Sequence, residues 1–104
     1  MRQTTAADLY QQFVALIDEA CASKDVYAVP KAAAAAGMEG GETPHGLSQR
    51  WDYTFVDLLG QTLLVHARWW DQSQAFSIRP DMHVMSVELK AGDTIARHKR
   101  RYEE

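Results

Sequence analysis

We predict a single α+β domain over residues 1–104, in which an N-terminal helix, a short alanine-rich helix, a four-stranded antiparallel meander sheet and a C-terminal helix follow one another. Hydrophobic residues recur with the period of a helix in the first 23 positions, and with a period of two between residues 50 and 90. A chain of 104 residues, 46% of them hydrophobic, is also long enough to bury one core. The predicted boundaries are a helix over 1–23, a short helix and glycine-rich loop over 24–49, the sheet over 50–90 and a basic helix over 93–104.

The first helix is predicted from its cap and from one apolar stripe. Thr5 is followed three residues later by Asp8, a variant of the capping box whose carboxylate also favours the positive start of a helix. The apolar residues that follow lie on one helix face: Leu9, Phe13, Leu16, Ile17 and Ala20. We expect this face to pack on the sheet. We interpret Cys21, at its edge, as a packing residue rather than a reactive thiol.

The segment "PKAAAAAG", residues 30–37, predicts a short second helix, because proline is tolerated at a helix start and glycine favours a helix end. The next twelve residues, "MEGGETPHGLSQ", contain three glycines and a proline and show no periodicity. They predict a loop over 38–49. We interpret His45 as a solvated loop histidine rather than as a ligand or catalytic residue, and the sequence leaves open whether this loop is functional or only flexible.

Four strands are predicted in "WDYTF", "LLVHARW", "AFSI" and "VMSVELK", separated by the turn-forming stretches "LLG", "DQSQ" and "PDM". A three-residue loop over 58–60, with Gly60 in the left-handed position, places Trp51 opposite Ala67. Continued through the later hairpins, this register predicts one core face, which the first helix covers. That face consists of Trp51, Tyr53, Phe55, Leu63, Val65, Ala67, Trp69, Phe76, Ile78, Met85, Val87 and Leu89.

The other face of the predicted sheet is polar but holds a tryptophan. Trp70 directly follows Trp69, so it points away from the core when Trp69 points into it. An exposed tryptophan beside arginines is the composition of a protein-binding hot spot. The candidate binding residues are therefore Trp70, Arg68, Arg79, Arg50 and Leu64. The alternative is that Trp70 and Leu64 rest under a loop or the last helix, and that the arginines are only solvated.

One pair of residues on this second face has side chains of the types that catalytic sites use. Asp52 stands opposite His66 in the predicted register, where a carboxylate orients an imidazole, and Arg68 and Arg79 lie beside the pair as groups that stabilise negative charge. If the chain is an enzyme, these four residues are the expected catalytic ones and phosphodiester cleavage is the expected reaction. We favour a surface pair without catalysis, because no nucleophile is evident. No metal or cofactor is expected, since the four histidines show no zinc spacing.

The closing segment, "AGDTIARHKRRYEE", predicts a helix capped by Asp93 or Thr94. Its basic residues are Arg97, Lys99, Arg100 and Arg101. We interpret this basic tail as mainly solvated, with the cations near the helix end favoured by the helix dipole.

Two stretches of the chain carry a family resemblance. "DLLGQTLLVHARW", followed later by "HKRRYEE", resembles the strand pair and terminal helix of BrnT-type toxins, which are small ribonucleases with an α/β fold. The first helix does not follow that family's pattern, and the stretch between the two pieces is longer by a hairpin. The resemblance implies RNA cleavage as the alternative activity.

Charge and cysteine content narrow the class of protein. The chain has 11 basic and 14 acidic residues, a net charge of -3, whereas proteins that coat nucleic acid are usually strongly basic. A single cysteine forms no internal disulfide, and no apolar run reaches the length of a membrane span. We therefore expect a cytoplasmic protein without a membrane partner.

The resulting prediction is a small non-enzymatic protein-binding module that acts through the second face of the sheet. Inhibitors, adaptors and accessory factors, including those that phages and mobile elements encode, belong to this class. A protein partner is favoured over nucleic acid, and a homodimer stays open. The alternatives are a small ribonuclease of the BrnT type, or a single-stranded nucleic-acid binder in which bases stack on Trp70.

Overall fold

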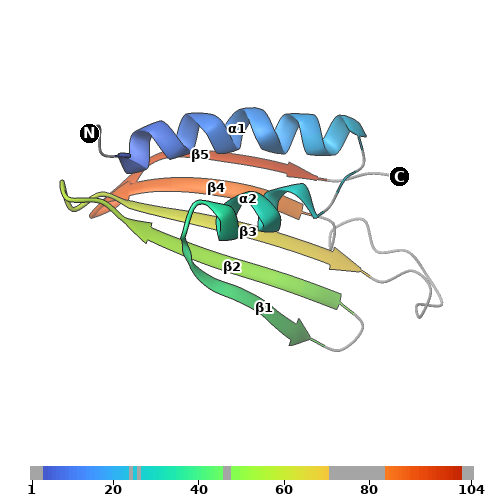
Figure 1. Ribbon diagram of the computed structural model, residues 1–104. Coiled ribbons are helices and arrows are strands. Elements are labelled where there is room, and N and C mark those ends of the chain that lie inside the picture. Colours follow the sequence, from blue (N-terminus) through green and yellow to red (C-terminus); the bar gives the residue numbers. More distant parts are fainter. Residues whose placement is uncertain (1–3, 24, 26, 46–47, 71–83, 102–104) are drawn as a thin grey trace.

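Two helices and one five-stranded antiparallel sheet make up the fold, in a computed structural model that describes residues 4–23, 25, 27–45, 48–70 and 84–101 (Figure 1). The mixed α+β class is confirmed. The sheet is a meander in which each strand pairs with the next along the chain, and both helices lie on the same face of it (Figure 1). The elements are α1 (Ala6–Ser23), α2 (Ala28–Ala35), β1 (Glu39–His45), β2 (Ser48–Val56), β3 (Thr62–Trp70), β4 (Val84–Ala91) and β5 (Asp93–Arg101).

The start of α1 is held by two side chains. As predicted, Thr5 caps the helix, because its Oγ1 accepts a hydrogen bond from the backbone N–H of Asp8 at 3.1 Å. A second acceptor comes from the turn between β2 and β3, where Oδ2 of Asp57 accepts from the N–H of Ala6 at 2.9 Å. Since the first N–H groups of a helix have no partner within it, these bonds fix where α1 begins.

The pairing of β2 with β3 follows the predicted register. Trp51 stands opposite Ala67 and Asp52 opposite His66. The N–H of Asp57 donates to the carbonyl of Gln61 at 3.0 Å and so encloses a three-residue loop, in which Gly60 has a φ of 81°. Glycine adopts this left-handed backbone without steric cost, which is why the loop fixes the register here.

The core lies between α1, α2 and the helix-covered face of the sheet. The predicted helix stripe is buried except for Leu16, which is half-buried, and Cys21 packs at its edge. Phe55 is also only half-buried. The side chains of Trp69, Phe76 and Ile78, which the sequence places in this core, lie outside the described residues. The buried strand residues of this face are Trp51, Tyr53, Leu63, Val65, Ala67, Met85, Val87 and Leu89.

The predicted loop over 38–49 is wrong over most of its length, because Glu39–His45 forms the edge strand β1 and β2 begins at Ser48. The sequence shows no strand pattern there, and long-range pairing with β2 supplies the hydrogen bonds instead. Gly40 has a φ of 132°, and a Cβ atom at this position would lie 2.0 Å from the carbonyl oxygen of Asp52. The glycine that indicated a loop is therefore required for the close approach of two strands.

The predicted C-terminal helix over 93–104 is also wrong, since Asp93–Arg101 forms β5 and pairs with β4. Residues 93–101 include only Ile95 and Ala96 as apolar residues, so a helix there would have no continuous apolar stripe to bury. A tight connection at Gly92 instead folds it back on β4. The sheet thus has five strands rather than four.

The strand predicted in "AFSI" and its flanking turns fall in residues 71–83, which lie outside the described residues. Among the described strands, β4 is the neighbour of β3, and Ala67 stands opposite Met85. The predicted meander would instead have paired Ala67 with the strand "AFSI". This correction changes which side chains meet on the sheet.

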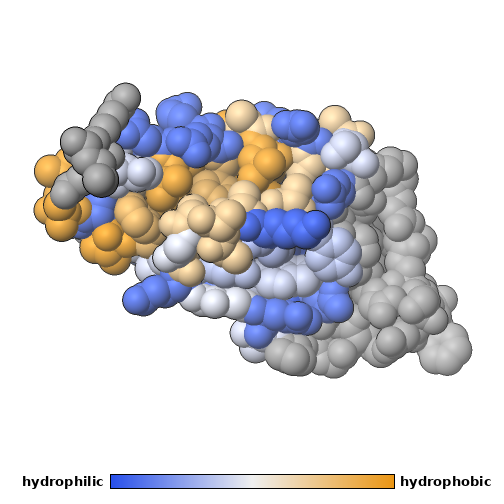
Figure 2. All heavy atoms as spheres, in the orientation of Figure 1, coloured by the Kyte–Doolittle hydropathy of each residue, from blue (hydrophilic) through white to orange (hydrophobic). Residues whose placement is uncertain are grey.

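Two further observations concern the surface. No helix among the described residues is long and apolar enough to cross a membrane. Hydrophobic residues gather at the end of the molecule where the β2–β3 turn lies (Figure 2). Leu58 and Leu59 in this turn are largely exposed.

Candidate functional site

The strand residues that point away from the helices form a second surface, which we call the open face. Because side chains alternate along a strand, its members follow from the register. No described helix covers it. Its described side chains are Glu39, Thr43, Arg50, Asp52, Thr54, Val56, Thr62, Leu64, His66, Arg68, Val84, Ser86, Glu88, Lys90, Thr94, Arg97, Lys99 and Arg101.

The predicted Asp52–His66 pair lies at the centre of the open face. Oδ1 of Asp52 is 2.6 Å from Nδ1 of His66, and Oδ2 accepts a hydrogen bond from Nε of Arg50 at 2.9 Å. Partial burial raises the pKa of Asp52, but the hydrogen bonds and charges of His66 and Arg50 outweigh it, so the pKa lies below its usual value. The carboxylate is therefore ionised at neutral pH and orients the imidazole through Nδ1.

Ser86 is a functional candidate that the sequence interpretation missed. It stands directly opposite His66 on β4, so Asp52, His66 and Ser86 form a row across three strands. The predicted strand at residues 75–78 would have separated them. The row lines a hollow of about 190 Å³ that Glu88 and Arg97 also line. A hydroxyl beside a carboxylate-oriented imidazole is the arrangement that general-base chemistry uses.

The basic tail is divided between the two faces of the sheet. Arg97, Lys99 and Arg101 alternate onto the open face as residues of β5. Arg100 points to the helix side, where its Nη1 lies 2.8 Å from Oδ1 of Asp18 in α1. The same oxygen lies 2.8 Å from Nε2 of His98. Three of the four predicted tail residues thus join the candidate binding surface, and the fourth ties β5 to α1.

The electrostatics around Asp18 support that structural role. Its pKa lies below the usual value, mainly because of the hydrogen bond from His98, with a smaller contribution from Arg100 against an opposing effect of desolvation. Nearby, burial raises the pKa of the Cys21 thiol, partly offset by the charge of Arg100. A raised thiol pKa fits the packing role predicted for Cys21.

Charge is unevenly distributed over the molecule. The described open face carries six basic side chains, Arg50, Arg68, Lys90, Arg97, Lys99 and Arg101, against three carboxylates, Glu39, Asp52 and Glu88, which gives +3. The whole chain has a net charge of -3, so the remaining residues sum to -6. An acidic protein therefore presents one basic surface.

Arg68 occupies a special position on this surface. It stands directly opposite Arg50 on β2, a like-charge pair that is unfavourable across neighbouring strands. Its Nε is buried and has no hydrogen-bond partner among the described residues. A buried donor without an acceptor is costly, so Arg68 is a position at which the described residues leave one hydrogen bond still to be made.

The remaining predicted site residues are placed only in part. Leu64 is half-buried on the open face, between Thr54 and Glu88. Trp70 stands opposite Ser48 at the end of β3, and His45 stands opposite the same residue at the end of β1. The side chains of Trp70 and His45, and all of Arg79 and His83, lie outside the described residues. Within the described part of the chain no cluster of three metal-ligating residues occurs.

Comparison with known proteins finds no match for this chain among family models, curated proteins or solved structures. The resemblance to BrnT-type toxins therefore stays a prediction.

Proposed function

We propose that this protein is a small binding module whose open face binds an acidic surface of a protein partner. The observation that carries the proposal is the excess of cations on this face in a chain that is otherwise acidic. Opposite potentials steer association and reject partners of the wrong charge. Arg68, whose Nε has no acceptor among the described residues, adds a guanidinium that can pair with a carboxylate of the bound protein.

A protein fits this face better than a nucleic acid does. Single-strand binders place aromatic side chains between cations so that bases stack on them, and the described side chains of the open face include no tryptophan, tyrosine or phenylalanine. The carboxylates of Glu39, Asp52 and Glu88 would also lie against phosphates. Mixed charge around the half-buried Leu64 is instead the composition of a polar protein interface.

Affinity capture with three baits tests the proposal. The wild-type protein should retain at least one acidic protein from a lysate at low salt. The double variant Arg97→Glu/Lys99→Glu should lose it, since two reversed charges oppose the partner. The variant Gln11→Glu, at an exposed position of α1 on the helix side of the molecule, should retain it. Equal retention by all three baits, or no acidic protein on the wild-type bait, would contradict the proposal.

RNA cleavage is a second candidate, favoured by one observation. The 2.6 Å contact between Asp52 and His66, with Ser86 and Arg97 beside it, places an oriented imidazole in a hollow with a cation. A ribonuclease uses such an imidazole for proton transfer. His66→Ala should then abolish cleavage of a mixed RNA pool while thermal stability is retained. Wild-type protein that leaves the pool intact, with and without Mg²⁺, would exclude this candidate.

A further inference from the structure

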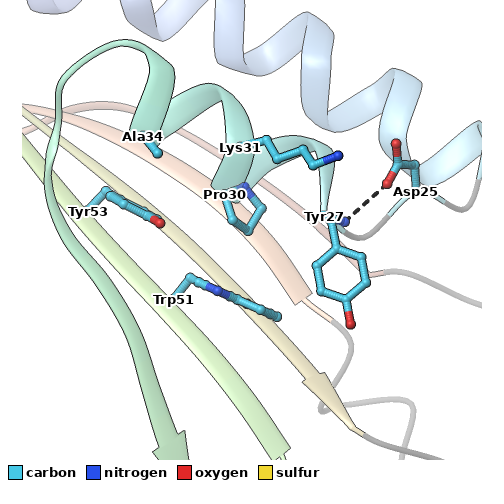
Figure 3. Close-up of a pocket in the computed structure, with 7 residues that line it drawn as sticks. All are labelled: Asp25, Tyr27, Pro30, Lys31, Ala34, Trp51 and Tyr53. Atoms are coloured by element: carbon cyan, nitrogen blue, oxygen red, sulfur yellow. Dashed lines mark hydrogen bonds between the residues drawn. The ribbon is translucent and has the colours of Figure 1, made fainter.

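A groove of about 520 Å³ lies between α2 and β2, on the side of the sheet opposite to the open face (Figure 3). Trp51 and Tyr53 of β2 form its floor, and Pro30 and Ala34 of α2 face them. Tyr27, just before α2, closes one end. The rings of Tyr27 and Trp51 are nearly perpendicular, at 83°, with their centroids 5.8 Å apart. Aromatic rings and a proline thus line an open groove of ligand size.

The groove stays open because the neighbouring positions are small. Gly40 of β1 stands opposite Tyr53 and has no side chain to lay over the ring. Ala34 is the residue of α2 above the floor, and its methyl group leaves the space between the layers unfilled. A larger side chain at either of these two positions would close the groove. Gly40 is fixed by its contact with Asp52 in any case.

The polar groups around the groove are mostly hydrogen-bond donors. None of the hydrogen bonds among the described residues uses the indole N–H of Trp51, the hydroxyl of Tyr53 or the ammonium of Lys31. The one carboxylate in the lining, Asp25, already accepts the backbone N–H of Tyr27 at 3.2 Å (Figure 3). The groove therefore combines flat apolar walls with donors and one positive charge, and it favours a ligand that offers acceptors.

We propose that this aromatic groove binds a proline-rich segment of a protein in the polyproline II conformation. Proline has no N–H, so such a segment presents carbonyl oxygens that carry partial negative charge and need donors. Its rings would pack against the exposed ring of Tyr27 and against the parts of Trp51 and Tyr53 that the groove leaves open, and its backbone is already ordered before binding. An extended segment of other composition would bring N–H groups, for which the groove offers few acceptors. This inference concerns a different surface from the open face and does not depend on the proposed function.

An NMR titration of the ¹⁵N-labelled protein with the peptide decaproline tests the inference. The indole N–H signal of Trp51, assigned by its absence in Trp51→Phe, should shift on addition of decaproline. A (Gly-Ser)₅ peptide of the same length should leave it unshifted. If decaproline shifts no signal of the groove, or if both peptides act alike, the proposal is overturned.

Two substitutions and a matched control identify the contacts. Trp51→Phe keeps an aromatic ring but loses the donor, so decaproline should bind about two- to tenfold more weakly. Lys31 is exposed, so Lys31→Met does not disturb the core. This substitution should weaken the binding of decaproline by about two- to fivefold. Thr54→Ala, an exposed position of β2 on the open face, should bind as the wild type does. Two results would contradict recognition of a polyproline backbone. One is that Lys31→Met and Trp51→Phe both bind decaproline as the wild type does. The other is that 2-naphthoate, a flat aromatic carboxylate, binds more tightly than decaproline.

Discussion

At the scale of single residues, Asp57 connects more of the fold than any sequence pattern indicates. Its two carboxylate oxygens accept the backbone N–H groups of Ala6, Leu59 and Gln61, each at 2.9 Å. One side chain thus closes the β2–β3 loop and holds the first turn of α1, which is 51 positions away in sequence. The loop was predicted from Gly60, but the link to the helix was not, because a cap so distant leaves no local pattern.

Replacing Asp57 with alanine should therefore lower the melting temperature. The substitution removes three acceptors at once and leaves N–H groups of α1 and of the loop without their partner. Asp93→Ala is the control, since Asp93 is exposed and its carboxylate makes no hydrogen bond among the described residues. Thermal unfolding, monitored by circular dichroism, gives the melting temperatures of both variants. A melting temperature of Asp57→Ala that equals that of Asp93→Ala would show that this link does not stabilise the fold.

The same carboxylate makes stability depend on pH. The N–H of Ala6, followed by those of Gln61 and Leu59, lowers the pKa of Asp57 against an opposing effect of desolvation. A group whose pKa is lower in the folded state stabilises it above the unfolded pKa, about 3.9, and this contribution is lost as the pH falls through the folded value. The difference in melting temperature between wild type and Asp57→Ala should be present at pH 7 and should shrink toward about pH 2. A difference that is constant over this range would contradict the role of the ionised form.

At the scale of elements, the central parts of β2 and β3 and their register were predicted, whereas β1 and β5 were missed. Alternating aromatic and polar residues with a glycine-containing turn fix the central hairpin locally. β1 contains "EGG", which has low strand propensity, and β5 contains five basic residues, counting His98. Both are edge strands, and edges tolerate glycine and charge because only one neighbour has to be matched. Their conformation is set by pairing with the adjacent strand, which local patterns do not contain.

The register of the central hairpin is tested by two neighbouring leucines of β3. Leu63 is fully buried under the helices, and Leu64 is half-buried on the open face. Leu63→Ala should destabilise the protein by about 2–5 kcal/mol, because it leaves a cavity in the core. Leu64→Ala should cost less than half as much. Urea denaturation of the two variants compares them, and a reversed order would mean that the strand presents its other face to the helices.

Two adjacent glycines test the close approach of β1 to β2. Gly40→Ala places a methyl group against the carbonyl oxygen of Asp52 at a positive φ, and it should cost about 1–3 kcal/mol of strain. Gly41→Ala meets nothing within 4 Å, and its effect should stay within about 0.5 kcal/mol. Both values come from the same urea denaturation measurement. Equal effects of the two substitutions would argue against the pairing of Gly40 with Tyr53.

At the scale of the whole molecule, the candidate site depends on the elements that sequence interpretation missed. The Asp52–His66 pair was predicted because both residues belong to the central hairpin. Ser86 was not placed beside it, since another strand was expected in between, and the cations of β5 were assigned to a helix. The sequence charge of -3 favoured a protein partner in general. Only the five-stranded arrangement gathers six cations on one face and suggests that this partner is acidic.

The central claim is that the open face is the binding surface, and the salt dependence of affinity tests it most directly. With the captured acidic partner, isothermal titration calorimetry at about 50 and 300 mM NaCl should show weaker binding at the higher concentration, because salt screens exposed charges. Arg97→Glu/Lys99→Glu should bind at least about tenfold more weakly than wild type at low salt, a loss of about 1.4 kcal/mol, and Gln11→Glu should match wild type. An affinity that is the same for all three proteins at both salt concentrations would contradict the claim that this face binds the partner.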